Sequence, residues 1–363
     1  MDRNTVVVGM SGGVDSSVAA LLLKKQGYNV IGVTMQIWLS DSLYDIARMD
    51  GCCSLSAVDD AQKVCERIGI EHRVLNFRDI FREKVIENFV HEYLNGRTPN
   101  PCIVCNRYVK WDALLSWALD NGAGYIATGH YARIQRLENG RYAIARSKTA
   151  AKDQTYALYS LTQEQLSHTI MPVGDYDKET VREMARKAGL AVSDKPDSQE
   201  ICFIEDNDYA GFIDRYPGIA VPGPGDFVTS DGRVLGRHKG ITHYTIGQRR
   251  GLNLPMGKHV YVTKIDPKKN EVIIGDGEDV FSESLSCSSL NFMSEEDLPE
   301  GTEKRLFCKI RYRHEGQWCS VVRSGKDELT VSFEEPVRAV TPGQSAVFYD
   351  GDVIFGGGII TGN

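Results

Sequence analysis

The sequence lacks any apolar run of about 20 residues, the length that a helix needs to cross a bilayer. It also lacks a signal-peptide pattern at its N-terminus, where a few polar residues lead directly into a strand pattern. Lysine and arginine number 42 against 49 aspartate and glutamate residues, so the formal net charge is -7. These absences exclude a membrane protein and a general nucleic-acid coat. They predict a cytoplasmic protein without a membrane partner, in which any RNA site is a local basic patch.

The nine cysteines are odd in number and irregular in spacing, as expected in a reducing compartment. Cys102 and Cys105 form a Cys-x-x-Cys loop before a helical pattern, and the dipole of a helix N-terminus lowers the pKa of a thiol. Cys202 lies in a second loop-like stretch, although packing at a strand end explains a single cysteine equally well. The others carry weaker signals or fit simple packing: Cys52, Cys53, Cys65, Cys287, Cys308 and Cys319.

The first part of the chain alternates strand and helix patterns, which predicts an α/β fold with a parallel sheet. We expect strands over residues 5–10, 29–38, 71–77 and 125–128, and helices over 14–27, 54–69, 79–94 and 109–121. From residue 217, glycine, proline and short alternating segments favour hairpins, and after residue 282 regular strands favour a β-barrel. The expected domains are 1–205, 206–280 and 281–363.

The loop VGMSGGVDSS, residues 8–17, joins the first expected strand to the first expected helix. Its glycine pair lets backbone approach an anion, and the helix N-terminus offers unpaired N–H groups. Asp15 is suited to Mg2+, and the hydroxyls of Ser11, Ser16 and Ser17 add hydrogen-bond donors. Neither GxxxxGK[ST] nor GxGxxG is present, so the loop is not a Walker or dinucleotide loop. It predicts a phosphate site in preference to a simple capped turn.

SGGVDSS resembles the pyrophosphate loop of the N-type ATP pyrophosphatases, which cleave ATP between its α and β phosphates and adenylate a substrate. With GRTPNPCIVCN, ATGHYAR, KDQTYAL, DSQEICFI and TIGQRRGL in this order, the chain is similar to the tRNA-specific 2-thiouridylase family (MnmA/TrmU type). That resemblance implies an adenine nucleotide alpha hydrolase-like (PP-loop) domain, a small β-rich central domain and a C-terminal β-barrel. It also implies ATP-dependent 2-thiolation of the wobble uridine of tRNAs for Lys, Glu and Gln.

The same resemblance assigns roles to matching residues. Cys105 and Cys202 would be the catalytic pair, with Cys202 taking a persulfide from a sulfur-carrier protein or cysteine desulfurase and a disulfide remaining after transfer. The ATP site would comprise Gly9, Met10, Ser11, Gly12, Gly13, Val14, Asp15, Ser16, Met35 and Gly129. The target base and the rest of the tRNA would be contacted by Asn100, Pro101, Cys102, His130, Lys152, Asp153, Gln154, Arg311, Tyr312 and Gln344.

One position departs from the commoner family pattern. Cys102 stands where many members carry aspartate, so a role of that aspartate does not transfer. Cys102, Cys105 and Cys202 are also enough ligands for a [4Fe-4S] cluster with one open iron, and cluster-dependent thiolation stays open beside the persulfide route. Two further alternatives are an amidotransferase-type ligase, whose chemistry would not require the cysteines, and a non-catalytic RNA-binding module.

A basic strip is expected in the barrel. If KRLFCKIRYR, residues 304–313, forms one strand, alternation places four basic residues on one face: Arg305, Lys309, Arg311 and Arg313. Tyr312 adds stacking area for an extruded base. A solvated strand face is the alternative, and Arg249 and Arg250 supply a second basic point.

Overall fold

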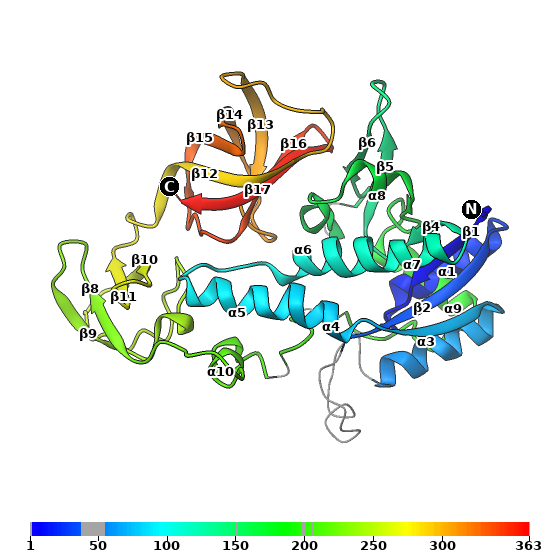
Figure 1. Cartoon of the computed structure of the whole chain (residues 1–363), viewed down its shortest axis with the longest axis horizontal. Coiled ribbons are helices and arrows are strands. Elements are labelled where there is room, and N and C mark those ends of the chain that lie inside the picture. The colour runs from blue at the N-terminus through cyan, green and yellow to red at the C-terminus, as the bar shows by residue number, and fades with distance from the viewer. Residues whose placement is uncertain (1, 38–54, 150–151, 198–200, 205, 363) are drawn as a thin grey trace. The chain divides into compact units, whose positions relative to one another are not determined.

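The computed structural model describes residues 2–37, 55–149, 152–197, 201–204 and 206–362 (Figure 1). Cys52, Cys53 and the predicted strand end at Trp38 lie outside these residues. Contacts divide the chain into two compact units. Unit 1 comprises Met1–Val85, Cys102–Asn207 and Asp352–Ile354, and unit 2 comprises Ile86–Pro101, Asp208–Gly351 and Phe355–Asn363.

Unit 1 contains a sheet of five parallel strands in the described part of the chain, in the order β3-β2-β1-β4-β7. The strands are β1 (Asp2–Gly9), β2 (Asn29–Gln36), β3 (Glu71–Asn76), β4 (Ala123–Ala127) and β7 (Thr169–Ile170). This confirms the predicted parallel sheet. The chain moves outward from β1 to β3 and then returns to β4 on the other side of β1. The strand order therefore reverses between β1 and β4, where open α/β sheets form a ligand-binding crevice at the carboxyl ends.

Helices cover both faces of this sheet (Figure 1). On one face, α1 (Val14–Lys25), α3 (Leu55–Ile68) and α9 (Lys178–Lys187) share a buried cluster with Val6 and Val8 of β1. Side chains alternate along a strand, so Gly9 faces the opposite side. There a Cβ on Gly9 would lie 3.7 Å from Leu114 Cδ2, in α7 (Leu114–Asp120). The end of β1 is thus fixed from both sides.

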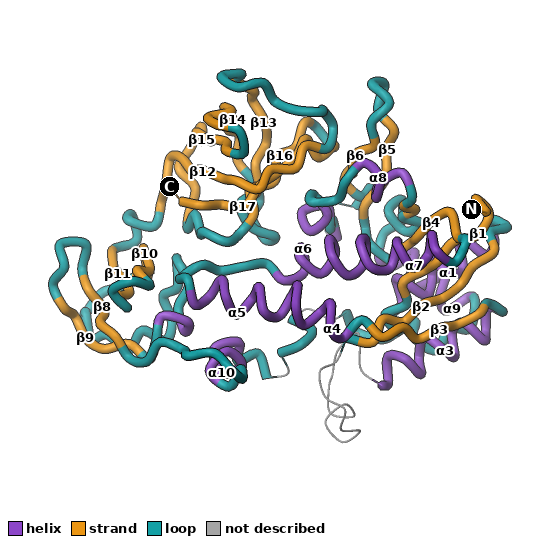
Figure 2. Tube along the Cα trace, in the orientation of Figure 1, coloured by secondary structure: helices purple, strands orange, loops and turns teal. Residues whose placement is uncertain are grey.

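The predicted helices over residues 79–94 and 109–121 are present, and each includes a π-helical segment. Figure 2 draws both as purple helical tubes. The first runs through α4 (Arg78–Phe81), η1 (Arg82–Ile86) and α5 (Glu87–Leu94). The second begins earlier than predicted and runs through α6 (Pro101–Cys105), η2 (Asn106–Ala113) and α7. Unit 1 further contains four elements that were not predicted individually: β5 (Ala132–Arg136), β6 (Tyr142–Arg146), η4 (Thr155–Leu158) and α8 (Gln163–Ser167).

The middle of the chain forms a small sheet in the order β10-β11-β8-β9. Its strands are β8 (Gly225–Val228), β9 (Val234–His238), β10 (Tyr261–Asp266) and β11 (Glu271–Gly275), with α10 (Tyr209–Asp214) and η5 (Ile241–His243) nearby in the sequence. Two antiparallel pairs confirm the predicted hairpins, although β11 runs parallel to β8. Phe227, Val262 and Val272 are fully buried in its core.

The last strands close into a barrel, which confirms the third part of the predicted fold. The order is β12-β15-β14-β13-β16-β17, and β17 pairs back onto β12. The strands are β12 (Phe281–Phe292), β13 (Glu303–Lys309), β14 (Gln317–Gly325), β15 (Glu328–Arg338), β16 (Ser345–Asp350) and β17 (Val353–Gly362). Cys287, Cys308 and Cys319 are fully buried in the barrel core, so their predicted packing role is confirmed.

The predicted single strand over residues 304–313 was wrong at its end. β13 stops at Lys309, and residues 310–313 form a bend and a turn. Ile310 is buried in the barrel core, and the N–H of His314 donates to the carbonyl of Arg311 at 3.0 Å. Because this turn bond replaces strand pairing, Arg311 and Arg313 do not continue the face that carries Arg305.

No helix among the described residues is long and apolar enough to span a membrane.

Candidate active site

The loop between β1 and α1 has a fixed backbone. Gly12 has a φ of 66°, and a Cβ there would lie 2.4 Å from the carbonyl oxygen of Ala57. Glycine is needed at this position both for the left-handed conformation and for the approach of α3. Gly13, the N-cap residue of α1, makes no side-chain cap hydrogen bond. The first N–H groups of α1 and its positive dipole end are therefore suited to an anion.

Serine hydroxyl groups form hydrogen bonds to the backbone of the loop and stabilise its conformation. The Ser17 hydroxyl is buried and donates to the Gly13 carbonyl at 2.8 Å, and the Ser16 hydroxyl donates to the same oxygen at 3.2 Å. Ser16 Oγ also accepts from the N–H of Ser11 at 3.2 Å. Ser16 and Ser17 thus brace the backbone, and their role as hydrogen-bond donors to phosphate stays a prediction. Ser11 is the exposed member of the three.

Gly129 lies directly against this loop. It follows β4, and a Cβ on it would lie 2.5 Å from the backbone nitrogen of Ser16 and 2.6 Å from the carbonyl carbon of Asp15. The structure therefore brings Gly129 together with the predicted phosphate loop at the point where strand order reverses. Met35 is half-buried near the carboxyl end of β2, the strand beside β1.

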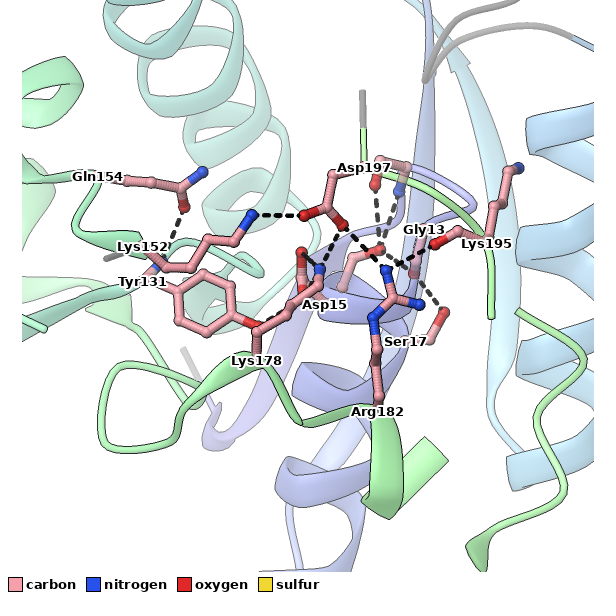
Figure 3. Close-up of polar contacts among 12 residues, drawn as sticks. Gly13, Asp15, Ser17, Tyr131, Lys152, Gln154, Lys178, Arg182, Lys195 and Asp197 are labelled. Carbon is pink, nitrogen blue, oxygen red and sulfur yellow. Dashed lines mark hydrogen bonds and ion pairs between the residues drawn. The ribbon is translucent and has the colours of Figure 1, made fainter. Parts of the chain in front are cut away.

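Asp15, in the first turn of α1, is the centre of a polar cluster (Figure 3). Its Oδ1 accepts from the Tyr131 hydroxyl at 2.7 Å, and Lys178 Nζ lies 2.8 Å from both of its carboxylate oxygens. The same Lys178 Nζ lies 2.5 Å from Oδ1 of Asp197. A lysine from α9 thus joins the carboxylate of the loop to a second carboxylate from a distant segment.

Three more cations surround these carboxylates (Figure 3). Lys152 Nζ lies 2.7 Å from Asp197 Oδ2, and Arg182 Nη2 lies 3.6 Å from Asp197 Oδ1. Lys195 Nζ lies 2.7 Å from Asp60 Oδ2 and donates to the carbonyl of Gly12 at 3.1 Å. Four cationic side chains and three carboxylates therefore meet beside the loop, and a polyanion would find a local excess of positive charge there.

The protonation states follow from these surroundings. Burial raises the pKa of Asp197, but hydrogen bonds and charges from Lys152 and Lys178 outweigh burial and lower its pKa overall. Burial, followed by the bond to Asp15, raises the pKa of the Tyr131 hydroxyl, which stays a donor. Burial, aided by the charge of Lys110, holds the pKa of His130 well below its ordinary value. His130 is therefore a neutral imidazole at neutral pH.

Of the predicted tRNA residues of unit 1, Lys152 belongs to the cluster and Gln154 is hydrogen-bonded to Tyr131 of the cluster. His130 Nδ1 is 2.8 Å from the Thr128 hydroxyl, and its ring lies 5.7 Å from that of Trp111. Gln154 Oε1 accepts from the N–H of Tyr131 at 2.9 Å, and Asp153 Oδ2 accepts from the Thr155 hydroxyl at 2.7 Å. These bonds fix the backbone of the 152–154 segment.

In unit 2, Gln344 anchors the segment that leads to Asn100 and Pro101. Its side-chain amide donates to the carbonyl of Thr98 at 2.8 Å, and the N–H of Thr98 donates to the carbonyl of Pro342 at 2.8 Å. Arg311 Nη1 donates to the carbonyl of Arg338 at 2.8 Å, while Tyr312 is exposed. Gln344 and Arg311 therefore have structural bonds in addition to their predicted contacts with tRNA.

None of the three candidate cysteines is fully buried. Cys102 is exposed in the first turn of α6, and Cys105 is half-buried at the end of that helix. The prediction placed this pair in a loop before a helix, but Pro101 begins the helix earlier because proline suits a first helical position. Cys202 is half-buried in a turn, with Phe203 packed against Phe81 at 5.8 Å between ring centroids.

The described cysteines do not form a metal site. Among residues 2–37, 55–149, 152–197, 201–204 and 206–362, no three His, Cys, Asp or Glu side chains are placed to hold a metal ion. Cys102, Cys105 and Cys202 are thus not gathered as a ligand set in this structure.

Sequence reasoning missed several members of the polar cluster: Asp60, Tyr131, Lys178, Arg182, Lys195 and Asp197. Their signal was weak because the contacts span long separations, 163 residues between Asp15 and Lys178. Asp197 and Tyr131 do lie inside the quoted motifs DSQEICFI and ATGHYAR. Considering every charged or hydroxyl side chain of these motifs as a candidate would have included both residues.

A parallel sheet with a glycine loop and helix N-terminus at its reversal point defines the class of nucleotide-binding α/β proteins. Three family models match consecutive parts of the chain: a tRNA methyl transferase HUP domain over residues 4–206, a tRNA methyl transferase PRC-barrel domain over 211–276 and an aminomethyltransferase beta-barrel domain over 282–360. The chain belongs to the tRNA-specific 2-thiouridylase MnmA family.

Relatives of that name match over nearly the whole length. The protein of Lachnoclostridium phytofermentans is 57% identical over 355 residues, covering 98% of this chain and 99% of the relative. The protein of Clostridium acetobutylicum is 56% identical with the same coverage, and that of Clostridioides difficile is 52% identical over 98% of this chain and 97% of the relative.

Proposed function

We propose that this protein is a tRNA-uridine 2-sulfurtransferase that thiolates the wobble uridine of tRNAs for Lys, Glu and Gln with ATP. The observation that carries the proposal is the loop of residues 9–16, whose glycine conformation and helix N-terminus lie at the reversal point of the sheet and would suit a phosphate. The full-length similarity to proteins named tRNA-specific 2-thiouridylase supports the substrate.

The chemistry needs an activated oxygen, because the C2 oxygen of uridine is a poor leaving group. The oxygen attacks the α-phosphorus of ATP, a new oxygen–phosphorus bond forms, and pyrophosphate leaves with the electron pair of the broken bond. The oxygen then departs as part of AMP when sulfur attacks C2. Residues 9–16 would hold the phosphates, and Met35 and Gly129 would line the adenosine side.

Mg2+ fits the residues next to the loop. It takes oxygen ligands and binds through one or two carboxylates together with substrate phosphates. Asp15 would hold it, in competition with Lys178 for the same carboxylate. When bound, the ion would neutralise phosphate charge, while Tyr131 keeps the remaining carboxylate oxygen oriented.

We propose the persulfide route for the sulfur. Cys202 would carry the outer sulfur received from a sulfur-carrier protein or cysteine desulfurase, and its half-buried position in a turn is compatible with loading by another protein. Cys105 would attack the persulfide, releasing sulfur to C2 and leaving a Cys105–Cys202 disulfide that external thiols reduce. Asn100, Pro101 and Cys102 would border the target base.

The remaining tRNA contacts would come from both units: His130, Lys152, Asp153, Gln154, Arg311, Tyr312 and Gln344. We further propose domain boundaries near residues 205 and 280, and the spans of the three family models support them.

The deciding experiment incubates the full-length protein with unmodified substrate tRNA, ATP and a persulfide donor. We expect AMP, pyrophosphate and 2-thiouridine at the wobble position, detected by nucleoside mass spectrometry. A matched tRNA with cytidine at that position should give none of the thiolated product. Release of ADP and phosphate in place of AMP and pyrophosphate would overturn the proposal.

A further inference from the structure

The cation closest to the carboxylate of the nucleotide loop belongs to Lys178. It is the first residue of α9, directly after the N-cap residue Asp177. Val181 and Ala185 of the same helix are buried in the core shared with α1, so the base of the lysine is fixed by packing. Its side chain is 14% exposed, which leaves the ammonium within reach of a bound ligand.

The bonds of Lys178 hold its charge at one point. An ammonium has three N–H donors, and three carboxylate oxygens from Asp15 and Asp197 lie within 2.8 Å of Nζ. The ring of Tyr131 lies 5.9 Å from the same nitrogen. A long, flexible side chain is thereby kept in one position beside the start of α1, which lowers the entropy that a ligand must overcome.

The charge of Lys178 supplies the local excess of positive charge at this point. Without it, three cations would face three carboxylates, and the Asp15 carboxylate would repel the phosphates of a nucleotide at close range. Lys152 and Lys195 are also present, but they form ion pairs with Asp197 and Asp60. Lys178 is the residue that offsets Asp15 itself.

We propose that Lys178 is a positioning residue for the pyrophosphate half of ATP, with Asp15 and Asp197 holding its ammonium at the N-terminus of α1. This inference rests on the proposed function. One N–H donor turns from a carboxylate to an oxygen of the β or γ phosphate. As the bond between the α-phosphorus and the bridging oxygen breaks, the ammonium keeps its proton and offsets the charge that develops on pyrophosphate.

The test compares ligands that differ only in their phosphates. Binding of AMP, pyrophosphate and a non-cleavable ATP analogue is measured by calorimetry on the full-length protein without tRNA. Loss of one charged hydrogen bond predicts that Lys178→Met weakens the ATP analogue and pyrophosphate roughly ten- to a hundredfold. AMP affinity should change less than about threefold, since AMP lacks the β and γ phosphates.

Lys187→Met is the matched control, because Lys187 lies on the same helix, is exposed and pairs with Glu183. It should bind all three ligands like the unchanged protein. Lys178→Arg should recover much of the lost affinity. If Lys178→Met does not fold, Lys178→Gln, which keeps a donor for Asp15 but no charge, takes its place with the same expected result.

Equal losses for AMP and the ATP analogue would show a structural role and overturn the inference, as would unchanged affinity for all ligands. Failure of the proposed function is distinguishable. A protein that binds ATP through Lys178 but forms no 2-thiouridine would overturn the thiolation proposal and leave the inference standing. If the protein forms 2-thiouridine but Lys178→Met binds all three ligands with unchanged affinity, the inference is overturned and the thiolation proposal stands.

Discussion

The nucleotide loop and the cysteine segments are built in opposite ways. In the loop, Ser16 and Ser17 are buried and bonded to the Gly13 carbonyl, and Asp15 is held by Lys178 and Tyr131. Cys102 is exposed at the start of a helix, and Cys202 is half-buried in a turn. Phosphate binding benefits from donors that are fixed in advance, whereas a thiol loaded by another protein must be accessible. We therefore expect the nucleotide loop to be sensitive to changes in backbone shape. The cysteine segments should be sensitive to replacement of a sulfur atom.

The largest effect is expected at the cysteines, where the chemistry of one atom matters. Cys105→Ser and Cys202→Ser should abolish 2-thiouridine formation, because serine can neither carry nor release sulfur. Cys102→Ser should retain substantial turnover. Nucleoside mass spectrometry of the product tRNA measures all three variants against the unchanged protein.

A cluster mechanism would give another pattern. All three serine variants would then be inactive, and protein purified without oxygen would contain iron and acid-labile sulfide near four per chain if the cluster is of the [4Fe-4S] type. Iron and sulfide lost together with activity in Cys102→Ser would overturn the persulfide route.

The second effect concerns shape in the loop. Gly12→Ala should lower ATP affinity by roughly 30-fold or more and destabilise the protein by about 1–3 kcal/mol, because its Cβ would collide with Ala57 at a positive φ. Gly27→Ala is the matched control: Gly27 has a φ of 91°, but nothing lies within 4 Å of its Cβ position. It should lose stability and keep ATP affinity. Calorimetric ATP binding and urea unfolding measure both, and equal ATP losses would contradict a shape requirement specific to the loop.

A third effect tests the basic residues near the end of β13. Removing Lys309 and Arg311 together should weaken tRNA binding roughly tenfold and lower the salt slope by about two, with ATP affinity unchanged. Arg305→Ala is the control, because Arg305 already pairs with Glu334 and stacks over Trp318 at 4.1 Å. Filter binding at several salt concentrations measures the slopes. Equal slopes for both variants would contradict a role of Lys309 and Arg311 in tRNA binding.

The smallest effect concerns pH and the turn after β13. Burial, aided by Arg311 and Lys309, lowers the pKa of His314 to about 4. The unfolded chain therefore binds more protons between about pH 4 and 6.5, and stability should rise with pH across that window. His314→Gln should reduce the rise in the free energy of unfolding across this pH range by about 1 kcal/mol, after allowance for partial exposure. Urea unfolding at pH 4.5 and 7 measures the difference, and an unchanged slope would contradict it.

The sequence predicted elements whose signal is local. Hydrophobic periodicity located the strands and helices around the loop, because burial on one or two faces imposes a period on the residues. The end of β13 was missed because Ile310 continues the alternating pattern while the backbone turns. Periodicity reports burial, and a buried residue in a bend has the same signature as one in a strand.

The site was predictable only in part, for the same reason. Gly12, Gly13 and Asp15 form a contiguous motif, and their role follows from strand, loop and helix. Lys178 and Asp197 join Asp15 only through the fold, across separations that local patterns do not encode. The resemblance located the motif of Asp197 but gave that residue no role.

The bond between Gln344 and Thr98 has a consequence for synthesis on the ribosome. Its two partners are 246 residues apart, and the bond between Thr98 and Pro342 spans a similar length. Synthesis adds roughly 5–20 residues per second, so the partners of Thr98 are made on the order of 10–50 s after Thr98 itself. A nascent chain can thus complete the sheet and its nucleotide loop while the segment preceding Asn100 still lacks its anchor. Truncation of the last strands would leave that segment unanchored permanently.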